Sequence, residues 1–208
     1  MSKVTVKQQI QDKVMAIIRA DERDFAVELC QTVLAAGVHT IEVTFTVPDA
    51  ANVIAHIKEH APNAVVGAGT VLSANQAAEA SRAGADFIVA PCVVEEVASF
   101  CREVDIFCVL GAMTPTEAFQ AYQAGSDAVK LFPGDQLDPK FIRAIKEPFP
   151  FMDFIPTGGI GPDNARTWFE HGAWSVGVGG YLTKGVQKTN LAVVGNRCRL
   201  LLESLHTP

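Results

Sequence analysis

The regular recurrence of short apolar segments is what most constrains the fold of this 208-residue chain. Eight runs of four to six residues, rich in β-branched side chains, are typical of buried strands. Longer amphipathic stretches between them predict helices; the stretch from Phe25 to Ala36 is an example, with Asp21 or Asp24 available to cap its start. The predicted strands are 14–19, 40–45, 64–69, 87–91, 106–110, 128–132, 154–157 and 175–178.

Four predicted helix-to-strand junctions carry a glycine, which accepts the left-handed conformation that ends many helices: Gly37, Gly84, Gly125 and Gly172. Eight strand–helix units without a long linker favour a closed (β/α)8 TIM barrel over a doubly wound sheet. We therefore expect one small α/β domain over residues 1–208. An extra N-terminal helix within 2–13 would cover the bottom of the barrel, and a helix within 189–205 would close it.

Composition excludes several classes of protein. With 49% hydrophobic and 19% charged residues the chain can bury a sizeable core, so disorder is not expected. The net charge of -6 and the lack of a basic run argue against nucleic acid and anionic membrane as partners. No signal peptide or membrane span is apparent, and five scattered cysteines suit reduced thiols, so we expect a cytoplasmic protein without a zinc site.

Lys130 lies inside the otherwise apolar sixth predicted strand. Because side chains alternate along a strand, Val129 and Leu131 are expected to face the helices, and Lys130 and Phe132 the barrel interior near its C-terminal mouth. Burying an ammonium group is costly unless it is paired or deprotonated. A desolvated lysine at the mouth is a usable nucleophile towards carbonyl carbons, whereas the alternative is a structural lysine paired with a buried carboxylate.

The second predicted strand supplies such a carboxylate, because its inward set is Glu42, Thr44 and Thr46. Layers inside these barrels draw side chains from alternate strands, so Glu42 and Lys130 are expected to face each other. A carboxylate there could move protons during Schiff-base formation and an aldol step. A salt bridge without chemistry is the alternative interpretation.

Other strand ends carry polar or small residues. Arg19 ends the first strand, where a guanidinium could bind a substrate carboxylate or could simply be solvated. Thr70 follows the third, where it could hydrogen-bond the substrate, cap the next helix, or both. Glycine pairs end the seventh and eighth strands, where this fold commonly binds phosphate through backbone N–H groups; tight turns are the alternative. These pairs are Gly158 with Gly159 and Gly179 with Gly180.

Four motifs then follow in order: Ile-Glu-Val-Thr at 41–44, Gly-Ala-Gly-Thr-Val-Leu at 67–72, Val-Lys-Leu-Phe-Pro at 129–133 and Pro-Thr-Gly-Gly-Ile at 156–160. Together they resemble the 2-keto-3-deoxy-6-phosphogluconate (KDPG) aldolases, a family that overlaps the 4-hydroxy-2-oxoglutarate (KHG) aldolases. The resemblance extends over about residues 14–184, and the ordered combination is more specific than any one motif. It implies a class I aldolase, which is a metal-independent carbon–carbon lyase.

The resemblance also implies roles for individual residues. Lys130 would form the Schiff base and Glu42 would act as acid and base. Arg19 would bind the substrate carboxylate, because Thr46 stands where some members carry an arginine, and Tyr181 is expected to crowd or reshape the phosphate end. The keto-acid pocket would be lined by Thr44, Thr70, Pro91, Phe132 and Thr157, and phosphate would be held by Gly158, Gly159, Gly179 and Gly180.

The implied reaction is cleavage of a 2-keto-3-deoxy-6-phospho sugar acid, or of 4-hydroxy-2-oxoglutarate, to pyruvate plus glyceraldehyde 3-phosphate or glyoxylate. The Lys130 amine would attack the C2 ketone, and the iminium would serve as electron sink for cleavage between C3 and C4. Glu42 would take the C4 hydroxyl proton. The resemblance implies no cofactor, small-molecule partners and a homotrimer.

Two other functions are compatible with the same residues. A phosphosugar isomerase or epimerase could use Glu42 as a base and Lys130 as an electrostatic stabiliser, without a covalent adduct. A non-catalytic phosphosugar-binding protein would leave the buried lysine and glutamate as an unexplained cost.

Overall fold

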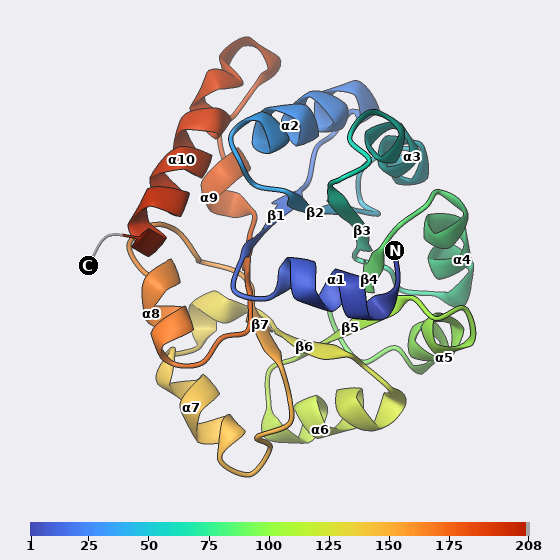
Figure 1. Ribbon diagram of the computed structural model, residues 1–208, viewed down its shortest axis with the longest axis vertical. Helices are drawn as coiled ribbons and strands as arrows, with labels where there is room; N and C mark the ends of the chain where they lie inside the picture. Colours follow the sequence, from blue (N-terminus) through green and yellow to red (C-terminus); the bar gives the residue numbers. More distant parts are fainter. Residues whose placement is uncertain (207–208) are drawn as a thin grey trace.

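The computed structural model describes residues 1–206. Eight parallel strands form one sheet in the order β7-β6-β5-β4-β3-β2-β1-β8, and helices surround it (Figure 1). β7 and β8 are joined by a bridge between Thr157 and Gly177 and by a 2.9 Å hydrogen bond from the backbone N–H of Trp174 to the carbonyl of Phe154. The predicted (β/α)8 barrel is therefore confirmed.

All eight predicted strands are present, with ends shifted by one or two residues. They are β1 Val14–Ile18, β2 Thr40–Thr44, β3 Val65–Gly69, β4 Phe87–Val89, β5 Phe107–Ala112, β6 Ala128–Leu131, β7 Phe154–Pro156 and β8 Val176–Val178. Neighbouring strands along the chain pair in parallel, and β1 also pairs with β8. The mouth of the barrel is thus the end where every strand finishes, as the sequence predicts.

Helices follow the strands as expected, and the extra N-terminal and closing helices are both present. None of the helices within the described residues is long and apolar enough to cross a membrane. The four junction glycines have φ values between 85° and 100°, which confirms their left-handed conformation. The helices are α1 Lys3–Ile10, α2 Arg23–Ala35, α3 Ala50–His60, α4 Ala74–Arg82, α5 Glu95–Glu103, α6 Pro115–Ala124, α7 Lys140–Lys146, α8 Ala165–Glu170, α9 Gly180–Thr183 and α10 Ala192–His206, with 3₁₀ turns at Gly134–Gln136 and Lys188–Asn190.

Two suggested helix caps are wrong. Glu22 occupies the cap position of α2, and its side chain makes no capping hydrogen bond. Asp21 lies one residue too early for that position, and Asp24 already lies in the first turn of the helix. There the Asp24 carboxylate still faces the positive end of the helix dipole. Thr70 does not cap α4, because that helix begins later and Ser73 accepts the 3.2 Å capping hydrogen bond.

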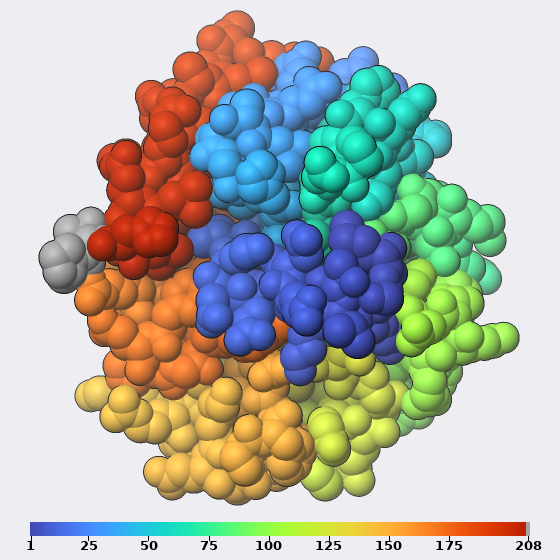
Figure 2. Space-filling model, in the orientation of Figure 1, coloured from blue at the N-terminus to red at the C-terminus, as the bar shows by residue number. Residues whose placement is uncertain are grey.

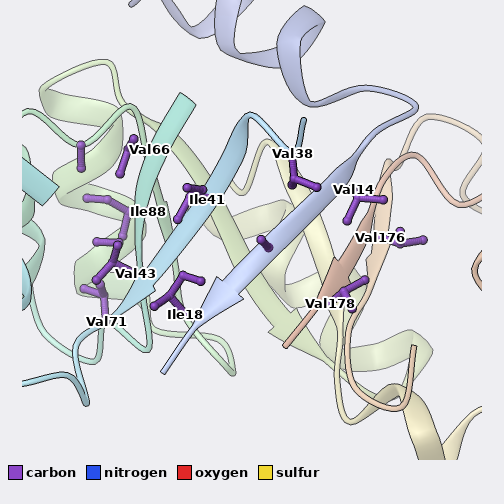
Figure 3. Packing of buried hydrophobic residues seen from close by; sticks show 14 of the residues in the cluster. Val14, Ile18, Val38, Ile41, Val43, Val66, Val71, Ile88, Val176 and Val178 are labelled. Carbon is purple, nitrogen blue, oxygen red and sulfur yellow. The ribbon is translucent and has the colours of Figure 1, made fainter. Parts of the chain in front are cut away.

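The core has two parts separated by the strands. The outer cluster fills the space between barrel and helices, and Figure 3 shows part of it, including Ile41 and Val43 from β2. Val129 and Leu131 of β6 belong to this outer cluster, as their alternation predicts. The inner cluster fills the lower half of the barrel and consists of Val6, Ile10, Met15, Val65, Phe87, Val89, Phe107, Val109, Ala128, Ile155 and Trp174.

α1 closes the bottom of the barrel, where it crosses the centre of the molecule (Figures 1 and 2). Its Lys3 pairs with Asp127 at 3.0 Å and its Lys7 with Asp153 at 2.7 Å. Those carboxylates directly precede β6 and β7, so the ion pairs hold α1 to the N-terminal strand ends. α1 therefore covers the end of the barrel opposite to the mouth.

The five cysteines are free, and all except Cys92 are buried. Burial raises the pKa of Cys30 to about 12 and that of Cys198 to about 11, so these two thiols stay protonated and act as small apolar groups. Within residues 1–206 no cluster of three His, Cys, Asp or Glu side chains could hold a metal ion.

Candidate active site

Lys130 on β6 and Glu42 on β2 meet inside the barrel near its mouth. Lys130 Nζ lies 3.4 Å from Oε1 of Glu42, and the two side chains are only 8% and 1% exposed. β2 and β6 are alternate strands of the ring, so the predicted shared layer is confirmed. An amine and a carboxylate thus lie within reach of one another where little water competes.

Gly69, the last residue of β3, makes room for Glu42. It pairs with Thr44 across the β2–β3 ladder, and a Cβ at position 69 would overlap the carboxylate of Glu42. Gly69 thus clears space for the acid/base candidate. A glycine inside a strand often signals such a close approach.

Phe132 and Pro91 contribute an apolar wall beside the lysine. Lys130 Nζ lies 5.6 Å from the centre of the Phe132 ring, which is 40% exposed. Phe132 and Pro91 line a common pocket of about 300 Å³, together with Gly111. Sequence reasoning missed Gly111, where a Cβ would overlap the carbonyl of Pro91; a lone glycine at the end of the fifth strand was the available signal.

Thr157 and Thr70 occupy two further strand ends at the mouth. The Thr157 hydroxyl is buried and donates a 3.4 Å hydrogen bond to the carbonyl of Ile155, and Gly177 on β8 leaves space for it. Thr70 follows β3 with a φ of 55°. A left-handed backbone is costly for a β-branched residue, and such strain clusters at functional positions.

Arg19 lies just beyond β1 and is held by Thr46, which lies two residues beyond the end of β2. Its Nη1 donates a 3.2 Å hydrogen bond to Oγ1 of Thr46. Thr46 is 2.8 Å from Oγ1 of Thr44, which donates to the carbonyl of Ile18 at 3.1 Å. Thr44 is thus buried in this network, and the network brings a guanidinium to the rim of the barrel.

The two glycine pairs come together as the fold predicts. Gly158 and Gly159 have φ values of 106° and 68°, and Gly179 precedes the short helix α9. Gly159 and Gly180 line a pocket of about 330 Å³, which Asp163 and Tyr181 also line. Burial raises the pKa of Tyr181, and the negative charge of Asp163 contributes to the same shift, while Arg197 opposes it. The sequence analysis missed Asp163, because this residue lies after the Pro-Thr-Gly-Gly-Ile motif.

A larger cavity than either of these lies elsewhere. It has about 1030 Å³ and opens at the bottom of the barrel, beside α1, α8 and α10. Neither member of the buried lysine–glutamate pair lines it. The pocket of about 300 Å³ at the mouth is the better candidate, because it is lined by Phe132, whose ring centre lies 5.6 Å from Lys130 Nζ.

Comparisons with known proteins agree with this geometry. The sequence profile described as KDPG and KHG aldolase matches residues 6–196. The KHG/KDPG aldolase of Escherichia coli strain K12 is 35% identical over 156 residues, which are 74% of this chain and 73% of the relative. The 2-dehydro-3-deoxy-6-phosphogalactonate aldolase of the same strain is 31% identical over 175 residues, 83% and 85% of the two chains.

A solved structure links the fold to covalent chemistry. The KDPG aldolase of Legionella pneumophila, with pyruvate captured as a covalent carbinolamine intermediate, has a TM-score of 0.83 and 25% identity, covering 97% of this chain and 98% of that one. The profile match spans most of the chain, and relatives above 30% identity share more than two thirds of it. This barrel therefore belongs to the KDPG and KHG aldolase family and is a class I aldolase.

Proposed function

We propose that this aldolase uses Lys130 as its Schiff-base nucleophile to cleave a 2-keto-3-deoxy-6-phospho sugar acid or 4-hydroxy-2-oxoglutarate. The observation that carries the proposal is the 3.4 Å contact between Lys130 Nζ and Glu42, both buried below the mouth. The names of the relatives support the two substrate classes. An isomerase or a binding protein is disfavoured, because neither explains the family membership.

The proposed mechanism moves electrons through the lysine. Lys130 first passes one proton to the neighbouring Glu42 carboxylate, and the resulting neutral amine attacks the C2 ketone. Glu42 returns that proton to the departing oxygen, which leaves as water, and a protonated iminium forms. The electrons of the C3–C4 bond move into the iminium while Glu42 takes the proton of the C4 hydroxyl, so an aldehyde departs and an enamine remains. Protonation at C3 and hydrolysis release pyruvate and restore the amine. The iminium is the electron sink, so no metal is needed.

The remaining site residues have proposed binding roles. Arg19 would hold the C1 carboxylate, because its planar fork matches two carboxylate oxygens. Thr44 would act through the hydrogen bonds that support Arg19. The keto-acid carbons would lie against Thr70, Pro91, Phe132 and Thr157, and a distal phosphate would meet the backbone of Gly158, Gly159, Gly179 and Gly180.

Borohydride reduction in the presence of pyruvate tests the nucleophile. We expect a reduced pyruvyl adduct on Lys130 in intact-mass and peptide-mapping experiments, because pyruvate alone forms the iminium. Lys130→Met should lose the adduct and retro-aldol turnover, whereas Lys140→Met, which removes an exposed lysine of α7, should keep both. A folded wild-type protein that forms no adduct, or forms it at another lysine, contradicts the proposal.

A panel of substrates tests the distal end. Cleavage of phosphogluconate-derived, phosphogalactonate-derived and hydroxyglutarate-type keto acids should be compared for the wild type and Tyr181→Ser. We expect the variant to change the ranking, because Tyr181 lines the pocket formed by the glycine pairs. An unchanged ranking would mean that Tyr181 does not determine specificity.

We also propose a homotrimer formed through an aromatic patch, defined as Phe119, Tyr122, Phe149 and Phe151. The ring centres of Phe119 and Phe149 lie 5.6 Å apart, and those of Tyr122 and Phe151 lie 4.8 Å apart. Tyr122 and Phe151 nevertheless remain 46% and 55% exposed. Such aromatic surface is typical of interfaces. Light scattering should give a trimer mass that Tyr122→Glu lowers and the control Leu200→Glu, on exposed α10 surface, does not.

A cytoplasmic location is proposed as well, because all five cysteines are free and reducing compartments favour that state. Cell fractionation would test it, and recovery outside the cytoplasm would contradict it.

A further inference from the structure

We propose that Thr46 is a positioning residue, which orients the guanidinium of Arg19 towards the carboxylate of the keto acid. Thr46 acts through a directed series of hydrogen bonds, here called the threonine relay, formed by Arg19, Thr46, Thr44 and the carbonyl of Ile18. The inference rests on the proposed role of Arg19 and adds the residue that controls it.

Counting protons fixes the direction of the relay. The Thr44 hydroxyl donates its single proton to the carbonyl of Ile18 at 3.1 Å. In the 2.8 Å contact with Thr46, Thr44 can therefore only accept. The Thr46 proton is then used, so its oxygen is free to accept from Arg19 Nη1 at 3.2 Å. Every link points the same way, from the cation to the backbone.

The relay begins in the most rigid part of the molecule. Ile18 and Thr44 are fully buried, and they end β1 and β2, which pair directly. Arg19 and Thr46, by contrast, are exposed at the rim. The hydrogen bonds therefore transmit the fixed geometry of two paired strands to an exposed, flexible side chain. An arginine held in place before binding loses less conformational freedom when substrate arrives.

Arg19 keeps its capacity to bind an anion. Across residues 1–206 it is a member of none of the ion pairs, and its partner Thr46 is neutral, so its charge is not compensated locally. A guanidinium has five N–H donors, and the relay uses one nitrogen. The remaining donors can meet both oxygens of a carboxylate. A carboxylate partner in place of Thr46 would instead neutralise the cation.

The test compares Thr46→Val, which removes the hydroxyl at nearly constant shape, with Thr46→Ser, which keeps it. We expect Thr46→Val to raise KM for the keto acid about three- to tenfold, the range of one lost hydrogen bond, with kcat within about twofold of wild type. Thr46→Ser should restore KM to near the wild-type value. Thermal denaturation checks that both variants fold, and a structural effect would change kcat and stability as well.

Two further measurements isolate the carboxylate. Pyruvamide lacks the carboxylate that Arg19 would bind. The yield of its borohydride-reduced adduct should therefore depend on pyruvamide concentration in the same way in wild type and Thr46→Val. In an Arg19→Met background the Thr46→Val change should have no further effect on KM, because the cation that it orients is gone. A KM effect that persists undiminished in that background overturns the relay.

The outcomes also separate this inference from the function on which it rests. If Arg19→Met raises KM but Thr46→Val does not, the relay alone is overturned and the aldolase mechanism stands. If Arg19→Met leaves the dependence on pyruvate unchanged, both the role of Arg19 and the relay are overturned. Absence of any pyruvate adduct in wild type contradicts the proposed nucleophile itself.

Discussion

Lys130 and Glu42 depend on each other for burial as well as for chemistry. Each charge is almost removed from water, and their 3.4 Å contact provides the compensation that a buried ion requires. Removing one partner of a buried pair typically costs about 3–5 kcal/mol, because the other charge is left uncompensated. For variants of this pair, both the catalytic rate and the free energy of unfolding must therefore be measured.

Replacing Glu42 with Gln should separate these effects, because the amide keeps the shape and can still accept a hydrogen bond from Lys130. Without a carboxylate to take the C4 hydroxyl proton, we expect kcat for retro-aldol cleavage to fall by about 10²- to 10⁴-fold. The pyruvate adduct should still be trapped. Glu59→Gln, an exposed control on α3, should behave as wild type, and an unchanged kcat in Glu42→Gln contradicts the assigned role.

Gly69→Ala should reduce activity by displacing the Glu42 carboxylate, which an added Cβ would overlap. We expect at least a tenfold fall in kcat and a loss of about 1–3 kcal/mol in the free energy of unfolding, as for other overpacked sites. Gly195→Ala is the matched control, since its neighbours are at ordinary contact distance within α10. Normal kcat in Gly69→Ala would show that the carboxylate position is not critical.

Among the elements, α6 has the best-defined start. Thr114 and Glu117 form a capping box, and hydrogen bonds from the backbone of Met113 and from Thr114 lower the pKa of the Glu117 carboxyl. A lowered folded-state pKa stabilises the protein above the ordinary glutamate pKa, and this contribution is lost as pH falls through the lowered value. The capping box thus anchors the loop that follows β5, the strand that contains Gly111.

Glu117→Gln should thus destabilise the protein at pH 7 by less than about 1 kcal/mol, because the group is exposed and screened by solvent. The difference from wild type should begin to shrink as pH falls below the ordinary glutamate pKa of about 4.3 and should vanish below the lowered folded-state pKa, where the wild-type carboxylate is itself protonated. Urea unfolding at both pH values measures it. An equal difference at both would show that the charge is irrelevant to the cap.

α1 stabilises the barrel without taking part in the reaction. Ile10 is fully buried within the inner cluster, so Ile10→Ala should lower the free energy of unfolding by about 2–5 kcal/mol. We expect kcat/KM at low temperature to stay unchanged, since α1 lies at the closed end. Val4→Ala, at an exposed position of the same helix, is the control. A loss of kcat/KM in Ile10→Ala would mean that packing at the closed end of the barrel affects the active site at the mouth.

At the scale of the whole molecule the barrel has a seam. β1 and β2 pair through four residue pairs and β2 and β3 through five, whereas β7 and β8 share the single bridge of Thr157 and Gly177. This seam contains Thr157, a proposed pocket residue, and the two glycine pairs follow the strands on either side of it. Limited pairing there leaves the loops of the distal end less restrained than those near Glu42.

Hydrogen exchange should reveal this seam. We expect backbone amides of 154–157 and 176–179 to exchange faster than those of 40–44 and 65–69, because fewer ladder hydrogen bonds must open. Mass spectrometry of peptides that cover these segments measures it, with the β2–β3 peptides as internal reference. Equal protection across the four segments would contradict the seam.

The amino-acid sequence by itself determined the eight strands, their inward and outward faces and the burial of Lys130 and Glu42. These features depend on residue alternation and on local turn chemistry, which short segments encode. The tertiary structure decided which neighbours each side chain meets: Gly69 beside Glu42, Thr46 beside Arg19, and the single bridge that closes the ring. Those contacts join segments far apart in the chain, and their distances follow from how the whole barrel packs.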